Sequence, residues 1–236
     1  MTLLVEKRQL VVPGEVLADG GYLAGDNTYE ECGKIYSQKL GLVEIKGKKI
    51  SVVALRGPYI PKVGDLVIGQ IVDVTIGGWL VDINSPYTAI LSVPEATGRT
   101  FNPKMGALTK ILTVGDIIAA KVISFDRTRD PALTIRGQGL GKIEGGVIIN
   151  LTPTKVPRLI GRKGSMINMI KQITGCNVIV GQNGRILIRG KNPQMMKATV
   201  EAIQMIEEQA HISGLTDKIR VFLENFKKSL GEVEAG

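Results

Sequence analysis

The sequence predicts a multidomain chain of 236 residues that is mainly β over its first 143 residues and α/β after them. Two observations carry this prediction. Short β-rich runs separated by Gly, Pro, Asn and Asp fill the first part. Beyond position 150 the apolar residues recur with helical spacing instead. The length allows one large domain or two to three small ones.

Residues 1–61 are expected to form an N-terminal β-rich domain. Leu42–Ile45 and Ile50–Leu55 flank the polar run Lys46–Lys49, a pattern typical of a hairpin. Gly57–Pro58 then predicts a turn or loop after this hairpin.

Residues 62–143 are expected to form a five-stranded barrel of the OB type. Turn-forming residues separate five short β-rich runs within about 80 residues, which suits that architecture. The five expected strands are Leu66–Val74, Trp79–Ile83, Thr88–Val93, Ile117–Phe125 and Ala132–Arg136.

Residues 144–211 are expected to have the element order β-α-α-β-β-α. Ile167, Ile170 and Ile173 recur every three residues and mark one face of a helix. Two β-rich runs then meet at an Asn183-Gly184 pair, a strong hairpin signal. Pro193 opens another helix, and residues 212–236 are expected to form a final amphipathic helix.

The net charge of +8 is concentrated in one part of the chain. Residues 145–200 carry nine basic residues and no acidic residue, whereas the rest nets to about −1. Such a block suits a polyanionic partner, because neutralising phosphates releases condensed counterions. A solvated basic surface is the alternative interpretation.

The sharpest motif is Gly161-Arg162-Lys163-Gly164, which lies between two expected helices inside this basic block. Two glycines let the backbone approach phosphates closely. The following helix directs its free N–H groups and positive dipole end toward the loop. This loop resembles the KH arrangement, in which a GXXG loop clamps about four nucleotides. A plain helical hairpin with a basic turn is the alternative.

With these motifs in view, residues 145–210 resemble a type I KH domain and residues 62–143 resemble an S1 domain. S1 domains usually carry aromatic residues where Ile76 and Trp79 stand, so the resemblance makes Trp79 a candidate base platform, with Tyr87 as another; a core role for Trp79 is the alternative. Stacking of this kind is worth about 1–3 kcal/mol per base. The remaining candidate RNA-binding residues are basic: Lys155, Arg158, Arg99, Lys121, Arg127, Arg129 and Arg136.

The whole domain order resembles the RNA-binding cap subunit of the archaeal exosome, the Rrp4-like family. The segment Val11–Glu15 and the Gly181-Gln182-Asn183-Gly184 turn match that family. The resemblance implies single-stranded RNA as ligand and a hexameric ring of RNase PH-like subunits as partner. It also implies three copies per complex, docking through residues 1–61, and phosphorolysis by the ring. A free-standing S1-KH regulator of transcription or translation is the alternative.

Residues for catalysis or metal binding are scarce. His211 is the only histidine, and Cys32 and Cys176 are far apart and in no C-x-x-C pattern. No P-loop is present. We therefore expect no catalytic residue, no metal and no cofactor, with a self-sufficient nuclease as a minor alternative. The chain lacks a signal-peptide core and an apolar run of about 18 residues, which predicts a cytoplasmic protein without membrane contact.

Overall fold

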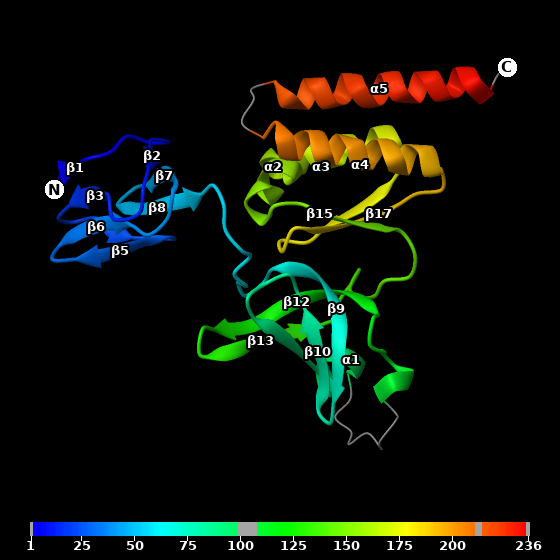
Figure 1. Cartoon of the computed structure of the whole chain (residues 1–236), viewed down its shortest axis with the longest axis horizontal. Helices are drawn as coiled ribbons and strands as arrows, with labels where there is room; N and C mark the ends of the chain where they lie inside the picture. Colours follow the sequence, from blue (N-terminus) through cyan, green and yellow to red (C-terminus); the bar gives the residue numbers. More distant parts are fainter. Residues whose placement is uncertain (1, 99–107, 211–213, 235–236) are drawn as a thin grey trace. The chain divides into compact units, whose positions relative to one another are not determined.

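The computed structural model describes residues 2–98, 108–210 and 214–234 of the chain. It divides into two compact units, Met1–Gly57 and Pro58–Gly236, which are treated separately (Figure 1). Among the described residues, no helix is long and apolar enough to cross a membrane. Arg99 and His211, both singled out from the sequence, lie outside the described residues.

The N-terminal unit consists of two small sheets that share one core. Its strands are β1 (Thr2–Leu3), β2 (Leu10–Val11), β3 (Val16–Asp19), β4 (Leu23–Ala24), β5 (Thr28–Glu31), β6 (Lys34–Ser37), β7 (Gly41–Lys46) and β8 (Lys49–Ala54). One sheet has the order β1-β3-β6-β5 and the other β2-β7-β8-β4. The expected hairpin is confirmed, since β7 and β8 pair antiparallel from Gly41↔Ala54 to Lys46↔Lys49. Leu17, Ile35 and Ile50 are fully buried between the sheets.

The second unit begins with a closed five-stranded barrel, as predicted. Its strands are β9 (Leu66–Thr75), β10 (Gly78–Asp82), β11 (Thr88–Ser92), β12 (Ile117–Asp126) and β13 (Arg129–Thr134). The barrel closes because β13 pairs antiparallel with β12 and parallel with β11. A short strand, β14 (Gly141–Lys142), extends the sheet beyond β12. Helix α1 (Val93–Thr97) and the 3-10 turn η1 (Leu108–Lys110) lie between β11 and β12 in the chain.

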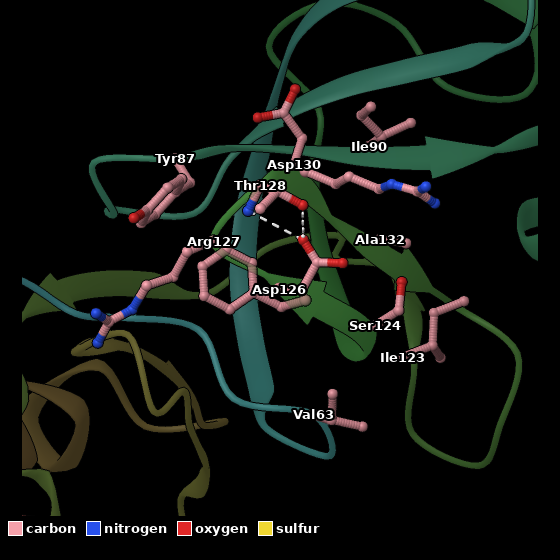
Figure 2. Close-up of a pocket in the computed structure, with 12 residues that line it drawn as sticks. Val63, Tyr87, Ile90, Ile123, Ser124, Asp126, Arg127, Thr128, Asp130 and Ala132 are labelled. Atoms are coloured by element: carbon pink, nitrogen blue, oxygen red, sulfur yellow. Dashed lines mark hydrogen bonds between the residues drawn. The ribbon is translucent and has the colours of Figure 1, made fainter. Parts of the chain in front are cut away.

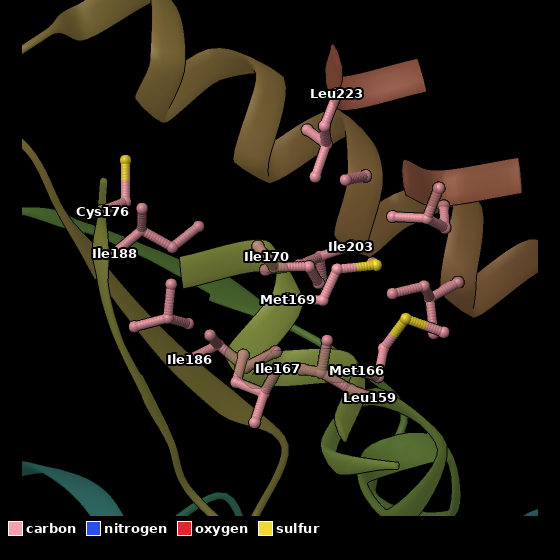
Figure 3. Close-up of a cluster of buried hydrophobic side chains, with 14 of the residues drawn as sticks. Leu159, Met166, Ile167, Met169, Ile170, Cys176, Ile186, Ile188, Ile203 and Leu223 are labelled. Carbon is pink, nitrogen blue, oxygen red and sulfur yellow. The ribbon is translucent and has the colours of Figure 1, made fainter. Parts of the chain in front are cut away.

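The expected β-α-α-β-β-α domain follows the barrel. Its elements are β15 (Val147–Asn150), η2 (Pro153–Lys155), α2 (Val156–Ile160), η3 (Arg162–Gly164), α3 (Ser165–Thr174), β16 (Asn177–Val180), β17 (Arg185–Arg189) and α4 (Pro193–Glu208). The sheet order is β15-β17-β16, antiparallel throughout. Ile167 and Ile170 of the predicted helix face are buried in the core with Ile186 and Ile203 (Figure 3).

The last helix, α5 (Leu215–Glu234), packs against α3 and α4 (Figure 1). Its residues Leu215, Ile219 and Leu223 are at most 1% exposed and join the same core as Ile203. At about 25 cal/mol per Å² of apolar area, three such side chains contribute several kcal/mol. The C-terminal helix is therefore part of the KH domain's core and not a free appendage.

Candidate nucleic-acid interface

The glycine loop has a backbone that only glycine supports at its first position. Gly161 has φ 75° and ψ 177°, and a Cβ added there would lie 2.8 Å from the backbone nitrogen of Met166. Lys163 and Gly164 are left-handed, with φ 51° and 80°. These turns direct the chain from α2 into α3 within four residues, so the loop presents its backbone at the surface.

The N-terminus of α3 has no side-chain cap, and of its first N–H groups that of Ser165 donates to the carbonyl oxygen of Arg162. Gly164 is the N-cap residue and provides no side chain to cap the first turn, which also holds no acidic residue. The first N–H groups of a helix have no intrahelical partner, and the helix dipole makes this end positive. An anionic group above the loop would therefore meet both hydrogen-bond donors and a favourable field.

Arg162 and Lys163 are exposed at the tip of this loop. Arg158 is also exposed, on α2. Lys155 is placed differently, because its ammonium group donates a hydrogen bond to the carbonyl oxygen of Glu207 near the end of α4. A cation at that position satisfies a free helix carbonyl. The structure therefore gives Lys155 a structural partner, and its contact with RNA remains a prediction.

The structure does not support Trp79 as a base platform. The ring is 0% exposed inside the barrel, and its indole N–H donates to the carbonyl oxygen of Leu112 at 2.9 Å. A ring without exposed surface cannot stack on a nucleobase. The large apolar area of tryptophan explains this placement, since its one polar group has a buried partner. Ile76, the other S1 position, is 97% exposed at the β9–β10 turn but is not aromatic.

Four basic candidates of the barrel lie on its outer surface. Lys121 is exposed on β12, Arg127 lies in the β12–β13 turn, Arg129 begins β13, and Arg136 follows β13. Arg127 and Arg129 line a groove of about 820 Å³ beside Tyr87 and other barrel residues (Figure 2). The structure thus brings Arg127, Arg129 and Tyr87 to one place.

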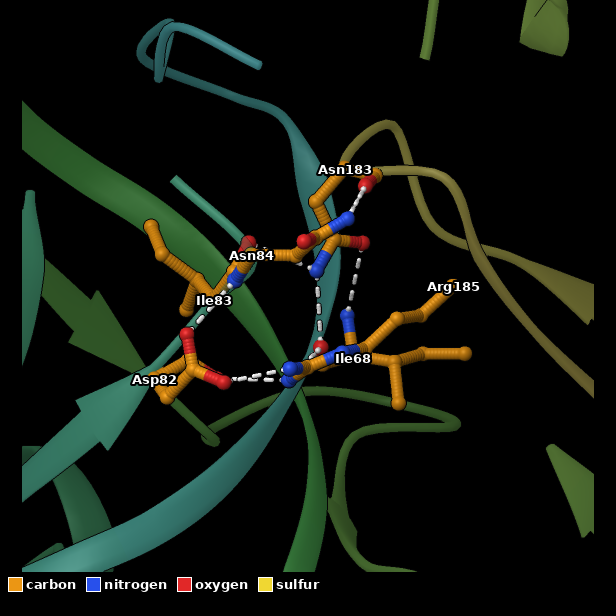
Figure 4. A network of polar contacts seen from close by, with 6 residues as sticks. All are labelled: Ile68, Asp82, Ile83, Asn84, Asn183 and Arg185. Carbon is orange, nitrogen blue, oxygen red and sulfur yellow. Dashed lines mark hydrogen bonds and ion pairs between the residues drawn. The ribbon is translucent and has the colours of Figure 1, made fainter. Parts of the chain in front are cut away.

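A polar network between the barrel and the KH domain was not predicted from the sequence (Figure 4). Asn183, in the β16–β17 turn, is 0% exposed. Its side-chain Nδ2 donates to the backbone carbonyl oxygens of Ile68 and Ile83 at 2.8 and 2.9 Å. Its side-chain Oδ1 accepts from the backbone N–H of Ile68 at 3.3 Å. The Asn84 side chain donates to the backbone carbonyl oxygen of Asn183 at 3.0 Å. The turn is therefore an attachment point between the domains.

Arg185 continues this network as an ion pair with Asp82 of β10. One guanidinium nitrogen also donates to the carbonyl oxygen of Asp82 at 2.7 Å. Burial alone would raise the pKa of the Asp82 carboxyl, but hydrogen bonds from Arg185 and from the Asn84 N–H outweigh it. Together they hold this pKa below its ordinary value. The only sequence sign of this contact was the G-x-N-G pattern itself.

These domains together define a class of protein. A five-stranded OB barrel followed by a KH domain with an intact GXXG loop is an RNA-binding arrangement of the S1-KH class. Residues 8–56 match the family described as exosome RNA binding protein RRP4 N-terminal domain. Residues 58–124 match the RRP4 S1 domain, and residues 146–208 match the KH domain.

Relatives of known name agree over nearly the whole chain. The exosome complex component Rrp4 of Methanobrevibacter smithii is 49% identical over 218 residues, covering 92% of this chain and 72% of the relative. The Rrp4 of Thermococcus kodakarensis is 46% identical over 232 residues, covering 98% and 90%. The chain belongs to the Rrp4 family of exosome complex components. A crystal structure described as an exosome complex RNA-binding protein is 47% identical, with a TM-score of 0.68 over 73% of this chain and 98% of that chain.

Proposed function

We propose that this protein is a non-catalytic RNA-binding cap subunit of an archaeal exosome. It captures single-stranded RNA and guides the 3′ end into a hexameric ring of RNase PH-like subunits, which performs the phosphorolysis. The observation that carries the proposal is the Gly161–Gly164 loop at the uncapped N-terminus of α3, within an acid-free stretch of the chain. The Rrp4 name of the relatives supports the assignment to an exosome.

In this proposal the loop holds the RNA backbone and not particular bases. The α3 N–H groups hydrogen-bond to phosphate oxygens, and Arg162 and Lys163 neutralise the neighbouring phosphates. Phosphate contacts position a strand without reading its sequence. A subunit that passes many different transcripts to a degrading ring needs this kind of recognition.

The outer face of the sheet of β2, β7 and β8 is the proposed contact with the ring. Leu10, Leu42 and Val53 are register partners across these three strands and therefore share one face. Leu10 and Val53 are 55% and 49% exposed. Contiguous exposed apolar residues mark interaction surfaces. Three copies on the ring would each use this face.

Charge reversal in the loop tests RNA capture. In Arg162→Asp/Lys163→Asp, affinity for a labelled single-stranded RNA, measured by fluorescence anisotropy, should fall at least tenfold because two phosphate contacts become repulsive. Lys227→Asp/Lys228→Asp is the matched control, since it makes the same charge change on exposed residues of α5. Equal affinities of the two double variants would contradict the proposal.

Assembly is tested separately by copurification with ring subunits. Leu10→Asp/Val53→Asp should abolish the large complex, whereas Val221→Asp should retain it, because Val221 is an equally exposed apolar residue on α5. The native mass of the wild-type complex should fit three copies. The isolated chain should leave labelled RNA intact with magnesium and phosphate present, and cleavage would refute its non-catalytic role.

A further inference from the structure

The N-terminal unit carries a stacked pair of tyrosines on the sheet of β1, β3, β6 and β5. Tyr29 of β5 and Tyr36 of β6 are register partners, and their ring centroids lie 5.2 Å apart at an interplanar angle of 18°. This distance is close to the spacing of about 4.8 Å between neighbouring strands, so the rings stack along the direction from strand to strand. β5 is the edge strand of the sheet (Figure 1). Among the described residues, no strand of the sheet therefore covers the far side of Tyr29.

The tyrosines lie on the outer face of their sheet. Ile35 and Ser37, the neighbours of Tyr36 on β6, are at most 2% exposed and face the core, so Tyr36 faces away from it. The other sheet of the unit, whose outer face carries Leu10 and Val53, packs on the opposite side of the same core. The tyrosine face and the proposed ring face therefore point in different directions, and a partner on one leaves the other accessible.

A row of charged residues lies beside the tyrosines on the same face. Asp19, Lys34 and Glu31 are register partners across β3, β6 and β5, two residues along the strands from the aromatic row. Two residues of a strand span about 6–7 Å, which one long side chain can bridge. All three residues are exposed, and none of their side chains forms an ion pair or hydrogen bond with another described residue. Two carboxylates and one ammonium group give the row a net negative charge.

These features favour a cationic partner over an anionic or an apolar one. Carboxylates beside the rings would repel the phosphates of RNA. An apolar segment would find little area, because Val16, opposite Tyr36 in the aromatic row, adds only a small, half-buried side chain. A guanidinium group both stacks on aromatic rings and binds carboxylates through two parallel hydrogen bonds. Arginine therefore suits the aromatic row and the charged row together.

We infer that the outer face of β3, β6 and β5 is a docking surface for an arginine-containing segment of a protein partner. One guanidinium group packs on the outer side of Tyr29 and pairs with Glu31, and a second pairs with Asp19. Lys34 competes with them for the carboxylates. The surface is independent of the glycine loop, since it lies in the other compact unit and binds the opposite charge. The chain carries a net charge of +8, so long-range attraction does not favour a cationic segment and binding has to come from these local contacts.

A fluorescein-labelled peptide of alternating arginine and glycine, titrated with the full chain by fluorescence anisotropy, tests this surface. Asp19→Asn/Glu31→Gln should weaken binding about fivefold through two lost ion pairs. Lys34→Gln should strengthen binding about twofold, because it removes the competing positive charge. Glu208→Gln/Glu224→Gln is the matched control: it removes two exposed carboxylates from α4 and α5 and should bind like wild type.

The aromatic contribution is measured in the same way. Tyr29→Leu/Tyr36→Leu should weaken peptide binding about fivefold through lost stacking of guanidinium groups. A peptide of alternating lysine and glycine should bind more weakly than the arginine peptide, since an ammonium group cannot stack in this way. Thermal melting of each variant checks that the N-terminal unit remains folded.

Several results would overturn the inference: no binding of the arginine peptide to wild type, weaker binding in Lys34→Gln, or a carboxylate variant that binds like its control. Loss of binding in Leu10→Asp/Val53→Asp would place the peptide on the ring face instead. If Tyr29→Leu/Tyr36→Leu lowers the affinity for labelled single-stranded RNA, the face binds nucleic acid. If the same variant abolishes a concentration-dependent dimer, a second copy is the occupant, and the inference is equally wrong.

Discussion

Removing the Asn183 side chain should destabilise the second unit more than any other asparagine truncation in it. Asn183→Ala deletes three hydrogen bonds at a fully buried position. The carbonyl oxygen of Ile68 keeps a weak partner, because an Arg185 nitrogen lies 3.4 Å from it. The carbonyl oxygen of Ile83 and the N–H of Ile68 lose this partner inside the domain interface.

The expected magnitude follows from these two groups. A buried polar group left without a partner costs about 1–3 kcal/mol, so two such groups should lower the free energy of unfolding by about 2–6 kcal/mol. For a unit of this size, each kcal/mol lowers the Tm by about 2–4 °C, which gives a loss of roughly 4–24 °C. The KH domain should also begin to unfold separately from the barrel, because the turn is their main polar link.

Urea titration and calorimetry of the full chain measure this effect. Asn177→Ala is the matched control: Asn177 is exposed at the start of β16, and surface truncations usually stay within about 0.5 kcal/mol. The reasoning is refuted if Asn183→Ala unfolds within 0.5 kcal/mol of wild type, because the interface would then tolerate the unpaired groups or admit water.

Three further outcomes are expected. Asp82→Asn should be less stable than wild type at neutral pH. The difference in the free energy of unfolding, measured by urea titration at several pH values, should narrow as the pH falls below about 3.9. A carboxyl group with a lowered pKa contributes stability that is lost when it is protonated, so a difference that stays constant with pH would contradict the ion pair. Lys155→Met should lower stability by about 1 kcal/mol through the lost contact with the carbonyl of Glu207, seen as a lower urea midpoint. Gly161→Ala should cost more stability than Gly175→Ala. Both glycines have positive φ, but only at Gly161 does an added Cβ clash with Met166. Equal urea midpoints of the two variants would show that the loop backbone shifts to relieve this clash.

Local patterns were sufficient for the elements of the fold. The barrel strands were predicted to within a few residues because turn-forming residues separate short apolar runs. The face of α3 followed from the isoleucine spacing, and Gly175 ends that helix with φ 67°. These signals depend on residues close together in the chain, so they can be recognised in the sequence.

The candidate site was predicted only in part. The glycine loop was identifiable because its glycines and charges are consecutive. The resemblance to S1 domains favoured Trp79 as a base platform, whereas the alternation of Trp79, Val81 and Ile83 with Leu80 and Asp82 places it on the interior face of β10. The structure shows the side chain in the core, bonded to Leu112, a residue 33 positions away. Tyr87, just before β11, and Phe125 of β12 pack edge to face, and no local pattern in the sequence indicates this contact.

The domain order, the element types and the concentration of positive charge can all be predicted from the chain, because composition, period and turn chemistry are properties of neighbouring residues. The role of the Asn183-Gly184 turn, by contrast, depends on the folded arrangement. A pair that normally sits exposed at a hairpin tip is buried here, since a side chain one hundred or more residues from Ile68 and Ile83 satisfies their backbone groups. The physical reason is that burial and hydrogen-bond partners depend on which surfaces meet in three dimensions.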